Sequence, residues 1–319
     1  MTTIKISSRI RYWDQSPTRR IAPTDRNGRT IEVAYFHLAQ FTGYSKHYPL
    51  PLLYSYKNKK LSLPLREKFM SLDRATVYEA GDMFFEDELP EVQKTVDIPV
   101  FYFVYNMANY YHFIYDTLPY LYSYFNEKKI HPDMKLLVSP PEGQDDLYPF
   151  VWDSLNMLGI TRDDVVFLDP EVMYNRVCVS SSLTHNGLSN CPPHDGVFEI
   201  LNSLKSDYIG PEKIYISRRT WVHNKKDNIG TDYTERRRCV NEDQMAQIFK
   251  LYGFKEVFCE NLTMEEKIGM FRTAKYVAGP IGGGMCNLIF SPPETKVMSI
   301  NSPTFMDVNL RFAYSMVHT

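Results

Sequence analysis

Residues 213–300 repeat one pattern, in which short apolar stretches alternate with longer amphipathic ones. The short stretches are rich in β-branched and aromatic residues, as strands are, and cover residues 213–217, 255–259, 275–279 and 296–300. Strands that alternate with helices in this way form parallel sheets. The sequence therefore predicts an α/β fold, whose ligands are expected beyond the carboxyl ends of the strands.

Two helices are predicted between these strands. Asn241 with Gln244, and Thr263 with Glu266, have the spacing of a helix N-cap and its box partner. The apolar residues that follow each cap fall at helical spacing and are Met245, Ile248, Phe249 and Tyr252 in the first helix and Met264, Ile268 and Phe271 in the second. Each set predicts one apolar helical stripe.

A glycine-rich loop, PIGGGMCN at 280–287, follows the third of these strands. Gly282, Gly283 and Gly284 have no Cβ atom, so their backbone can approach a ligand closely, and a helix that starts here would offer free N–H groups to a phosphate. Asn287, at the end of the loop, is a further candidate. The alternative is a tight turn with no ligand. The loop lacks the first-strand position and GxGxxG spacing of a dinucleotide-binding dehydrogenase, which disfavours hydride transfer.

Basic residues stand near the expected strand ends. Ser217, Arg218 and Arg219 close the first strand, and Arg237 and Arg238 precede the first helix. Arginine binds phosphate oxygens through a planar fork and stays charged at any working pH, so these residues are candidates for binding an anionic ligand. The alternative for the arginine run is a solvated loop held by surface ion pairs.

Two carboxylates and a histidine complete the candidate site. Glu242 is a candidate for the ribose hydroxyls of a nucleotide, although an acidic residue in a first helical turn also favours the helix dipole. His112 and Asp116 are four residues apart, so on a helix they would share one face. We assign Asp116 as candidate general base and His112 as its orienting partner, or the reverse. The alternative is a structural pair beneath packed aromatic residues.

In order and spacing, these motifs resemble the family 61 glycosyltransferases. The resemblance covers about residues 100–305 and rests on KIYISRR, ERRRCVNEDQ, the stretch from YGFKEVF to KVMSI, and NYYHFIYDTLPYLY at 109–122. That family includes plant β-xylosyl- and arabinosyltransferases and animal enzymes that add N-acetylglucosamine. One position departs from the family pattern: its loop usually reads GPHGAG, and here Ile281 stands where the histidine is expected.

The resemblance implies two Rossmann-like domains that face each other across a cleft, the GT-B type, and inversion at the anomeric carbon. It makes residues 1–208 an acceptor-side domain and residues 209–319 a nucleotide-sugar-binding domain. The expected donor is a UDP-sugar, with xylose favoured and N-acetylglucosamine next, and the expected acceptor is a glycan hydroxyl. Ile281 keeps open the alternative of a non-catalytic relative that binds a nucleotide sugar or a glycan.

The first half carries strand signals of its own, at 100–104, 135–139, 165–168 and 176–180, and a helical stretch at 147–158. Gly210 and Pro211 break the chain before the second set of strands, which places the domain boundary nearby. Residues 1–95 are left open between acceptor contacts and an additional strand layer.

The chemistry of the leaving group bears on metal use. Its growing charge needs either a divalent metal on an Asp-x-Asp pair or fixed cationic side chains. The sequence contains no Asp-x-Asp pair, so we predict a metal-independent reaction that uses arginine and no cofactor besides the donor. Its five cysteines lack paired spacing, which disfavours a zinc site or a disulfide scaffold.

Charge and hydropathy limit the expected partners. With 36 basic and 38 acidic residues the formal net charge is −2, so no broad basic field for nucleic acid is expected. No apolar stretch reaches the roughly 18 residues of a membrane span, and the N-terminus lacks a signal-peptide core. We expect a cytoplasmic enzyme of a bacterium or large virus, or a trimmed form of a secretory enzyme. Peripheral membrane contact stays open.

Overall fold

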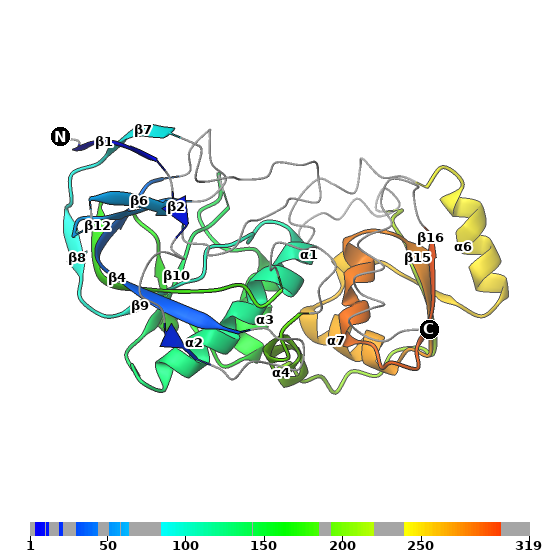
Figure 1. The fold of residues 1–319 in the computed structure, drawn as a ribbon. Helices are drawn as coiled ribbons and strands as arrows, with labels where there is room; N and C mark the ends of the chain where they lie inside the picture. The colour runs from blue at the N-terminus through cyan, green and yellow to red at the C-terminus, as the bar shows by residue number, and fades with distance from the viewer. Residues whose placement is uncertain are drawn as a thin grey trace. The chain divides into compact units, whose positions relative to one another are not determined.

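The computed structural model describes residues 4–9, 11–12, 19–21, 30–43, 51–57, 59–63, 84–141, 143–184, 193–219 and 239–300. The chain, drawn in Figure 1, divides into two compact units. The first unit comprises Met1–Met107, Tyr115–Leu147 and Ile160–Val197; the second comprises Ala108–Ile114, Tyr148–Gly159 and Phe198–Thr319. The second unit thus takes two segments from the first half of the chain. The division into domains 1–208 and 209–319 stays a prediction.

The first unit is built on a mixed sheet of ten strands. Its parallel part has the order β11-β10-β9-β12 and consists of β9 (Val100–Tyr102), β10 (Lys135–Val138), β11 (Val165–Phe167) and β12 (Val172–Ser180). Numbered along the chain, this order is 3-2-1-4, as in one half of a doubly wound sheet. The four strand signals in this region are confirmed.

Residues before 95 add strands to this sheet. β12 pairs antiparallel with β4 (Glu32–Phe41), and β5 (Leu53–Ser55) and β6 (Lys60–Leu63) follow on. The remaining strands of the unit are β2 (Arg11–Tyr12), β3 (Arg19–Arg20), β8 (Lys94–Val96) and the separate pair β1 (Ile4–Arg9) and β7 (Phe84–Leu89). The core includes the stacked rings of Phe41 and Tyr102, whose centroids are 5.5 Å apart. Of the two alternatives left open for this region, additional strands are therefore present.

Helices that precede the second sheet belong to both units. The first unit contains α2 (Leu121–Lys128) and the short 3-10 helices η3 (Leu118–Tyr120) and η4 (Arg162–Asp164). The second unit contains α1 (Tyr110–His112) and α3 (Pro149–Met157). α3 confirms the helical stretch expected at 147–158. α4 (Gly196–Ser203) begins at the end of the first unit and continues into the second.

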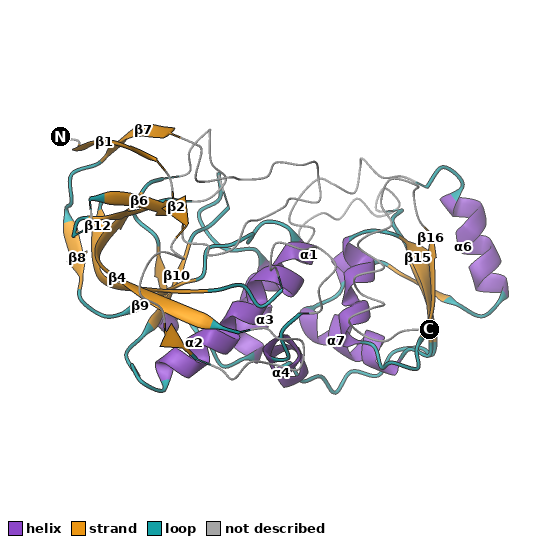
Figure 2. Cartoon of the chain, in the orientation of Figure 1, coloured by secondary structure: helices purple, strands orange, loops and turns teal. Residues whose placement is uncertain are grey.

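The second unit contains a four-stranded parallel sheet in the order β14-β13-β15-β16 (Figure 2). Its strands are β13 (Lys213–Ile216), β14 (Lys255–Val257), β15 (Tyr276–Pro280) and β16 (Lys296–Ile300). All four predicted strands are confirmed, and so is the α/β class. Numbered along the chain, the order is 2-1-3-4, which reverses direction between β13 and β15.

Two helices cross over this sheet, α6 (Glu242–Leu251) and α7 (Met264–Thr273), and Figure 1 shows them on opposite faces. Right-handed crossovers require this, because α6 leads to β14 on one side of β13 and α7 leads to β15 on the other. The Thr263 capping box is confirmed: the Thr263 hydroxyl accepts from the N–H of Glu266, and the Glu266 carboxylate accepts from the N–H of Thr263. Asn241 caps α6 without a side-chain hydrogen bond, so the box predicted with Gln244 is wrong.

The two helices differ in how they bury their stripes. Met264, Ile268 and Phe271 of α7 are fully buried, as predicted. Of the predicted stripe in α6, Met245 and Phe249 pack against the core around Tyr215, which also includes Ala246 of the same helix. The other two members of the predicted stripe, Ile248 and Tyr252, are 52% and 70% exposed, so only part of the predicted apolar stripe is buried.

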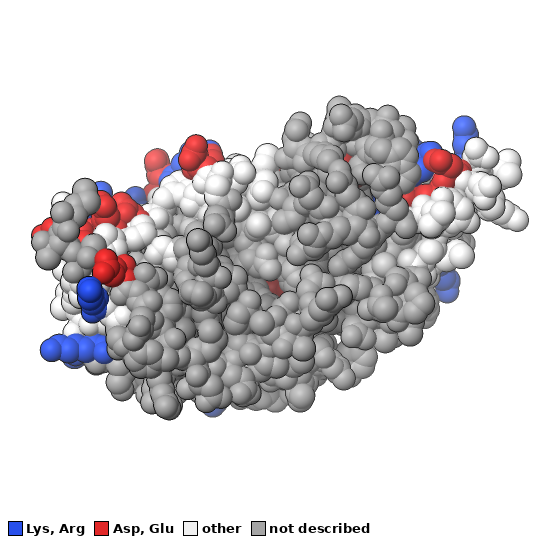
Figure 3. Space-filling model, turned by 90° about the horizontal axis from the view of Figure 1, so that it is seen from above, with Lys and Arg blue, Asp and Glu red and all other residues white. Residues whose placement is uncertain are grey.

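Surface charge is mixed where it can be described. On the face drawn in Figure 3, described acidic and basic side chains lie near one another. This distribution agrees with a formal net charge of −2. Among the helices of the described residues, none is long and apolar enough to cross a membrane.

Candidate functional site

The site is built where the strand order of the second sheet reverses, at the carboxyl ends of β13 and β15. Ligands of doubly wound sheets bind in the crevice at this point, since the connections on its two sides leave toward opposite faces. Ser217, Arg218 and Arg219 directly follow β13, and the glycine-rich loop directly follows β15. The topology therefore brings together two motifs that the sequence predicts to bind the same ligand.

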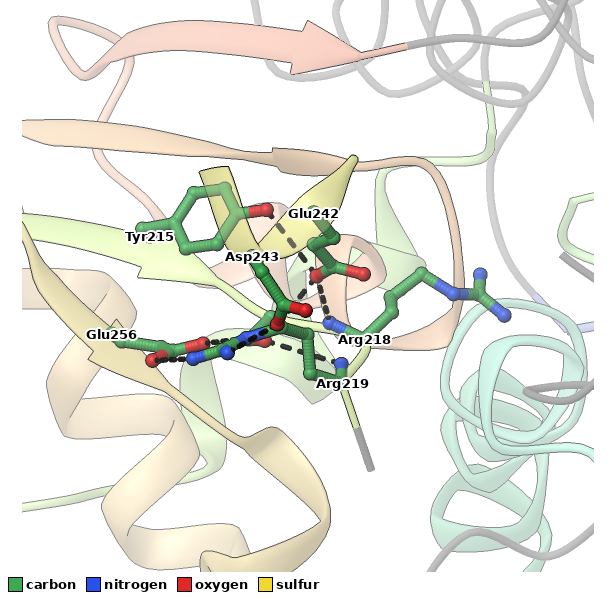
Figure 4. Close-up of polar contacts among 7 residues, drawn as sticks. Tyr215, Arg218, Arg219, Glu242, Asp243 and Glu256 are labelled. Atoms are coloured by element: carbon green, nitrogen blue, oxygen red, sulfur yellow. Dashed lines mark hydrogen bonds and ion pairs between the residues drawn. The ribbon is translucent and has the colours of Figure 1, made fainter. Parts of the chain in front are cut away.

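Glu242, the first residue of α6, lies buried at the centre of this edge with 1% exposure. Its Oε1 atom accepts three hydrogen bonds: from the Arg218 backbone N–H at 2.6 Å, the Ser217 hydroxyl at 3.2 Å and the Tyr215 hydroxyl at 3.3 Å (Figure 4). Its Oε2 atom is also buried and has no hydrogen-bond partner among the described residues. A buried carboxylate oxygen without a donor is costly, so one oxygen of Glu242 remains able to accept a hydrogen bond.

The Tyr215 hydroxyl supports this arrangement as a neutral donor. Burial raises the pKa of Tyr215, and the neighbouring Glu242 carboxylate raises the pKa further. The hydroxyl therefore keeps its proton and continues to donate to Glu242.

Arg218 is buried, and its side chain points away from Glu242 (Figure 4). Its Nη1 donates to the backbone oxygen of Ile281 at 2.6 Å, which anchors the guanidinium against the glycine-rich loop. A Cβ atom on Gly282 would lie 1.9 Å from this Nη1. A side chain at position 282 would therefore displace the arginine from this position.

Arg219 is held by acidic side chains of its own unit. Its Nε and Nη2 atoms donate to the two carboxylate oxygens of Glu256 at 2.9 and 2.6 Å, and its Nη1 donates to Asp243 at 2.6 Å (Figure 4). The hydrogen bonds to Glu256 raise the pKa of Arg219, with Asp243 adding to the effect. This arginine links β13, β14 and α6, so its charge is largely compensated inside the protein.

Two further glycines, one inside the loop and one just before it, are packed closely against Ile216. A Cβ on Gly284 would lie 2.7 Å from Ile216 Cγ2, and one on Gly279 would lie 2.7 Å from the Ile216 backbone oxygen. Only a Cβ on Gly283, of the three glycines at 282–284, would meet nothing within 4 Å. The helix that follows is present as the 3-10 helix η7 (Gly283–Phe290).

Asn287 joins this loop to α1. It is fully buried; its Nδ2 donates to the Gly284 oxygen at 2.9 Å, and its Oδ1 accepts from the Tyr110 hydroxyl at 2.5 Å. The ammonium group of Lys267, which is 2% exposed, lies 4.7 Å from the centre of the Tyr110 ring. A buried cation therefore lies over the tyrosine ring that is hydrogen-bonded to the loop.

The candidate base lies in an unusual helical segment. Asp116 belongs to the π-helix η2 (Phe113–Thr117), and His112 is the last residue of the short α1. The two residues thus lie in different kinds of helical turn, and their sharing of one face stays a prediction. Asp116 is 1% exposed and accepts a 3.0 Å hydrogen bond from the Thr184 hydroxyl. The fragmentary helix places His112 in the second unit and Asp116 in the first.

Comparison with known families decides what kind of protein carries this site. The model of the family described as Glycosyltransferase 61 matches residues 110–298, more than half of the 319-residue chain. The chain belongs to this family. No curated protein matches the chain in sequence. As a family 61 glycosyltransferase it acts, in general terms, on a sugar donor and a glycan acceptor.

Every candidate residue lies within the matched range, but they differ in their surroundings. One sheet edge brings together Ser217, Arg218, Glu242 and the glycine loop. Asn287 lies at the end of that loop, within η7. Arg237 and Arg238 lie outside the described residues. Thr184 and Tyr110 were not candidates, since only the fold brings Thr184 to Asp116 and Tyr110 to Asn287.

Metal ligands are not grouped in the part of the chain that the structure describes. No three His, Cys, Asp or Glu side chains there are placed to hold an ion together.

Proposed function

We propose that this family 61 glycosyltransferase transfers a sugar from a UDP-sugar to a glycan hydroxyl, with inversion and without a metal. The observation that carries the proposal is the buried Glu242 carboxylate at the topological switch point. One of its oxygens accepts three hydrogen bonds from protein donors, and the other is buried and has no partner among the described residues. The hydroxyls of a ribose are donors of the kind that this oxygen requires.

Charge at the same edge supports a diphosphate. Arg218 lies against the glycine-rich loop, and its planar guanidinium suits phosphate oxygens. In the proposal, Arg218, Arg237 and Arg238 neutralise the charge that develops on the leaving diphosphate, and Arg219 holds the sheet edge in place. Fixed cations of this kind act like a metal ion without needing metal ligands.

In the proposed reaction, Asp116 removes the proton of the acceptor hydroxyl as its oxygen attacks the anomeric carbon, and the bond to UDP breaks on the opposite face. His112 would orient this base or exchange roles with it. A GT-B arrangement of two Rossmann-like domains is part of this proposal, with xylose as the favoured sugar and N-acetylglucosamine next.

The test is calorimetric titration of UDP into wild-type protein, Glu242→Gln and a control, Glu256→Gln. A glutamine can keep its oxygen toward Tyr215, Ser217 and Arg218 while its NH₂ replaces Oε2, so the variant removes mainly the unused acceptor. We expect Glu242→Gln to weaken UDP binding by roughly 1.5–3 kcal/mol, the scale of a hydrogen bond to a charged group. Equal affinity in all three proteins would place the nucleotide elsewhere.

A binding-only function is the second candidate, and Ile281 favours it. This residue is buried, and its backbone N–H donates to Ile300 at 2.9 Å while its oxygen accepts from Arg218. The position thus contributes backbone contacts where the family resemblance expects an imidazole. A screen of nucleotide sugars for transfer and hydrolysis separates the candidates, because a binder retains a nucleotide sugar without turning it over.

A further inference from the structure

Every strand of the second sheet begins at a lysine. Lys213, Lys255 and Lys296 are the first residues of β13, β14 and β16, and Lys275 directly precedes β15. Because parallel strands start at the same edge, the four side chains form a row along the amino edge. The strand register confirms their proximity: Tyr276 pairs with Lys213 on one side and with Lys296 on the other.

Apolar side chains project beside this row. Helix α6 ends at Leu251, and Tyr252 caps it; these two residues are 85% and 70% exposed. The Lys213 ammonium donates to the Tyr252 backbone oxygen at 3.2 Å, so the end of the helix is tied to the lysine row. We call these six residues, Lys213, Lys255, Lys275, Lys296, Leu251 and Tyr252, the amino-edge surface.

The amino-edge surface is basic even when its acidic neighbours are counted. Glu212 pairs with Lys275 at 2.6 Å, but the two side chains are 64% and 66% exposed, where ion pairs are weak. Glu294 precedes Lys296 by two residues. Lys255 and Lys296 are exposed, and Lys213 is partly buried against the rings of Phe254 and Tyr276.

We propose that the amino-edge surface docks on an anionic lipid membrane. Exposed lysines beside a protruding aliphatic and a protruding aromatic side chain are the combination that binds such surfaces: the lysines are attracted to the headgroups and the apolar groups enter the interface. A nucleic-acid backbone would use the lysines but not Leu251. Since the amino edge is opposite the carboxyl edge that holds Glu242 and Arg218, docking leaves the candidate donor site uncovered.

The test is co-sedimentation of the full chain with vesicles of phosphatidylcholine alone or mixed with phosphatidylglycerol. Wild type should sediment with the mixed vesicles only, and less so as salt is raised. Lys255→Gln and Lys296→Gln should each lower partitioning roughly five-fold, the factor for about 1 kcal/mol per lysine near an anionic surface. Leu251→Ser should also reduce it.

A matched control is the other exposed helix end, where Lys129 closes α2 and the next residue, Ile130, is 56% exposed. The double variant Lys129→Gln, Ile130→Ser should sediment like wild type, and circular dichroism should show all variants folded. The proposal is overturned if wild type ignores mixed vesicles or if the control loses as much as the amino-edge variants. It is also overturned if the lysine variants lose binding to a DNA oligomer while Leu251→Ser has no effect on vesicles.

Discussion

The Tyr110 hydroxyl donates a 2.5 Å hydrogen bond to Asn287 Oδ1 and thereby joins α1 to the glycine-rich loop inside the second unit. Asn287 in turn holds the Gly284 oxygen, and Lys267 lies over the Tyr110 ring. Burial raises the pKa of Tyr110 well above its ordinary value, so the hydroxyl stays protonated and continues to donate. Since His112 is the last residue of α1, this hydrogen bond links the helix that carries His112 to the glycine-rich loop.

Tyr110→Phe should lower the free energy of unfolding by roughly 1–3 kcal/mol, because it leaves the buried Asn287 oxygen without its donor. Urea denaturation measures this. Tyr276→Phe, at a residue that is 43% exposed, serves as the control and should change the free energy little. If both variants unfold at the wild-type urea concentration, the bond contributes nothing.

Gly282→Ala should displace the Arg218 side chain, since the added Cβ would lie 1.9 Å from Nη1. The bond to Ile281 would be lost, and UDP affinity should fall roughly tenfold, the factor for about 1.4 kcal/mol. Gly283→Ala is the matched control, because its Cβ meets nothing within 4 Å. Calorimetry on both variants checks this, and equal affinities would contradict a role for Arg218 in binding.

Asp116→Asn should reduce transfer roughly 10²–10⁴-fold while leaving UDP affinity nearly unchanged, because it removes the proposed base but little of the shape. Thr184→Val removes the hydroxyl that donates to Asp116 and should slow transfer roughly tenfold. Thr184→Ser, which keeps the hydroxyl, should recover most of the rate. An Asp116→Asn enzyme with wild-type turnover would shift the assignment of base to His112.

Chelator should leave transfer, or slow hydrolysis of the donor, intact. The reason is that fixed arginines replace the metal in the proposal. Activity is measured before and after treatment with chelator, with manganese added back as the control. Complete loss in chelator that manganese restores would refute the arginine mechanism.

The buried Lys267 should make the free energy of unfolding change with pH in the alkaline range. Burial lowers its pKa from the ordinary 10.5. As pH rises from the folded pKa to 10.5, the unfolded chain retains a proton that the folded chain has lost, so this residue's contribution to the free energy of unfolding increases. Lys267→Met should therefore differ most from wild type near neutral pH, and the difference should shrink toward pH 10.5.

Urea unfolding of both proteins across this range measures the difference. The raised pKa of Cys259, about 12, keeps that thiol protonated in the folded state across the range, and its titration in the unfolded chain is common to both proteins and cancels in the difference. A constant difference between the two proteins would show that Lys267 keeps the same charge in the folded and unfolded states.

The strands of the second sheet are predictable from the sequence because each strand has a local apolar signal. The strand 296–300 is found with its predicted bounds, and Thr263 caps α7 through the expected box. The burial of α6 is less predictable. Apolar periodicity shows that a helix has an apolar stripe but not how much of that stripe the sheet covers, and Ile248 and Tyr252 remain exposed.

Other parts of the site depend on contacts between distant residues or on irregular backbone. The π turn around Asp116 has no simple sequence signal, and Thr184 reaches Asp116 only through the fold. The motif residues Arg218 and Arg219 look equivalent in sequence, yet one lies against the loop and the other is held by Glu256 and Asp243. Spacing alone does not distinguish them, because the difference lies in which carboxylates the fold supplies.

The fit between Gly282 and Arg218 also constrains how the chain can evolve. A side chain at position 282 would take the space that the Arg218 guanidinium occupies, so the arginine would have to move away from the loop. A relative with a larger residue at position 282 should therefore hold its arginine elsewhere, carry a shorter residue at position 218, or bind its anionic ligand in another way. The two positions should therefore vary together across relatives.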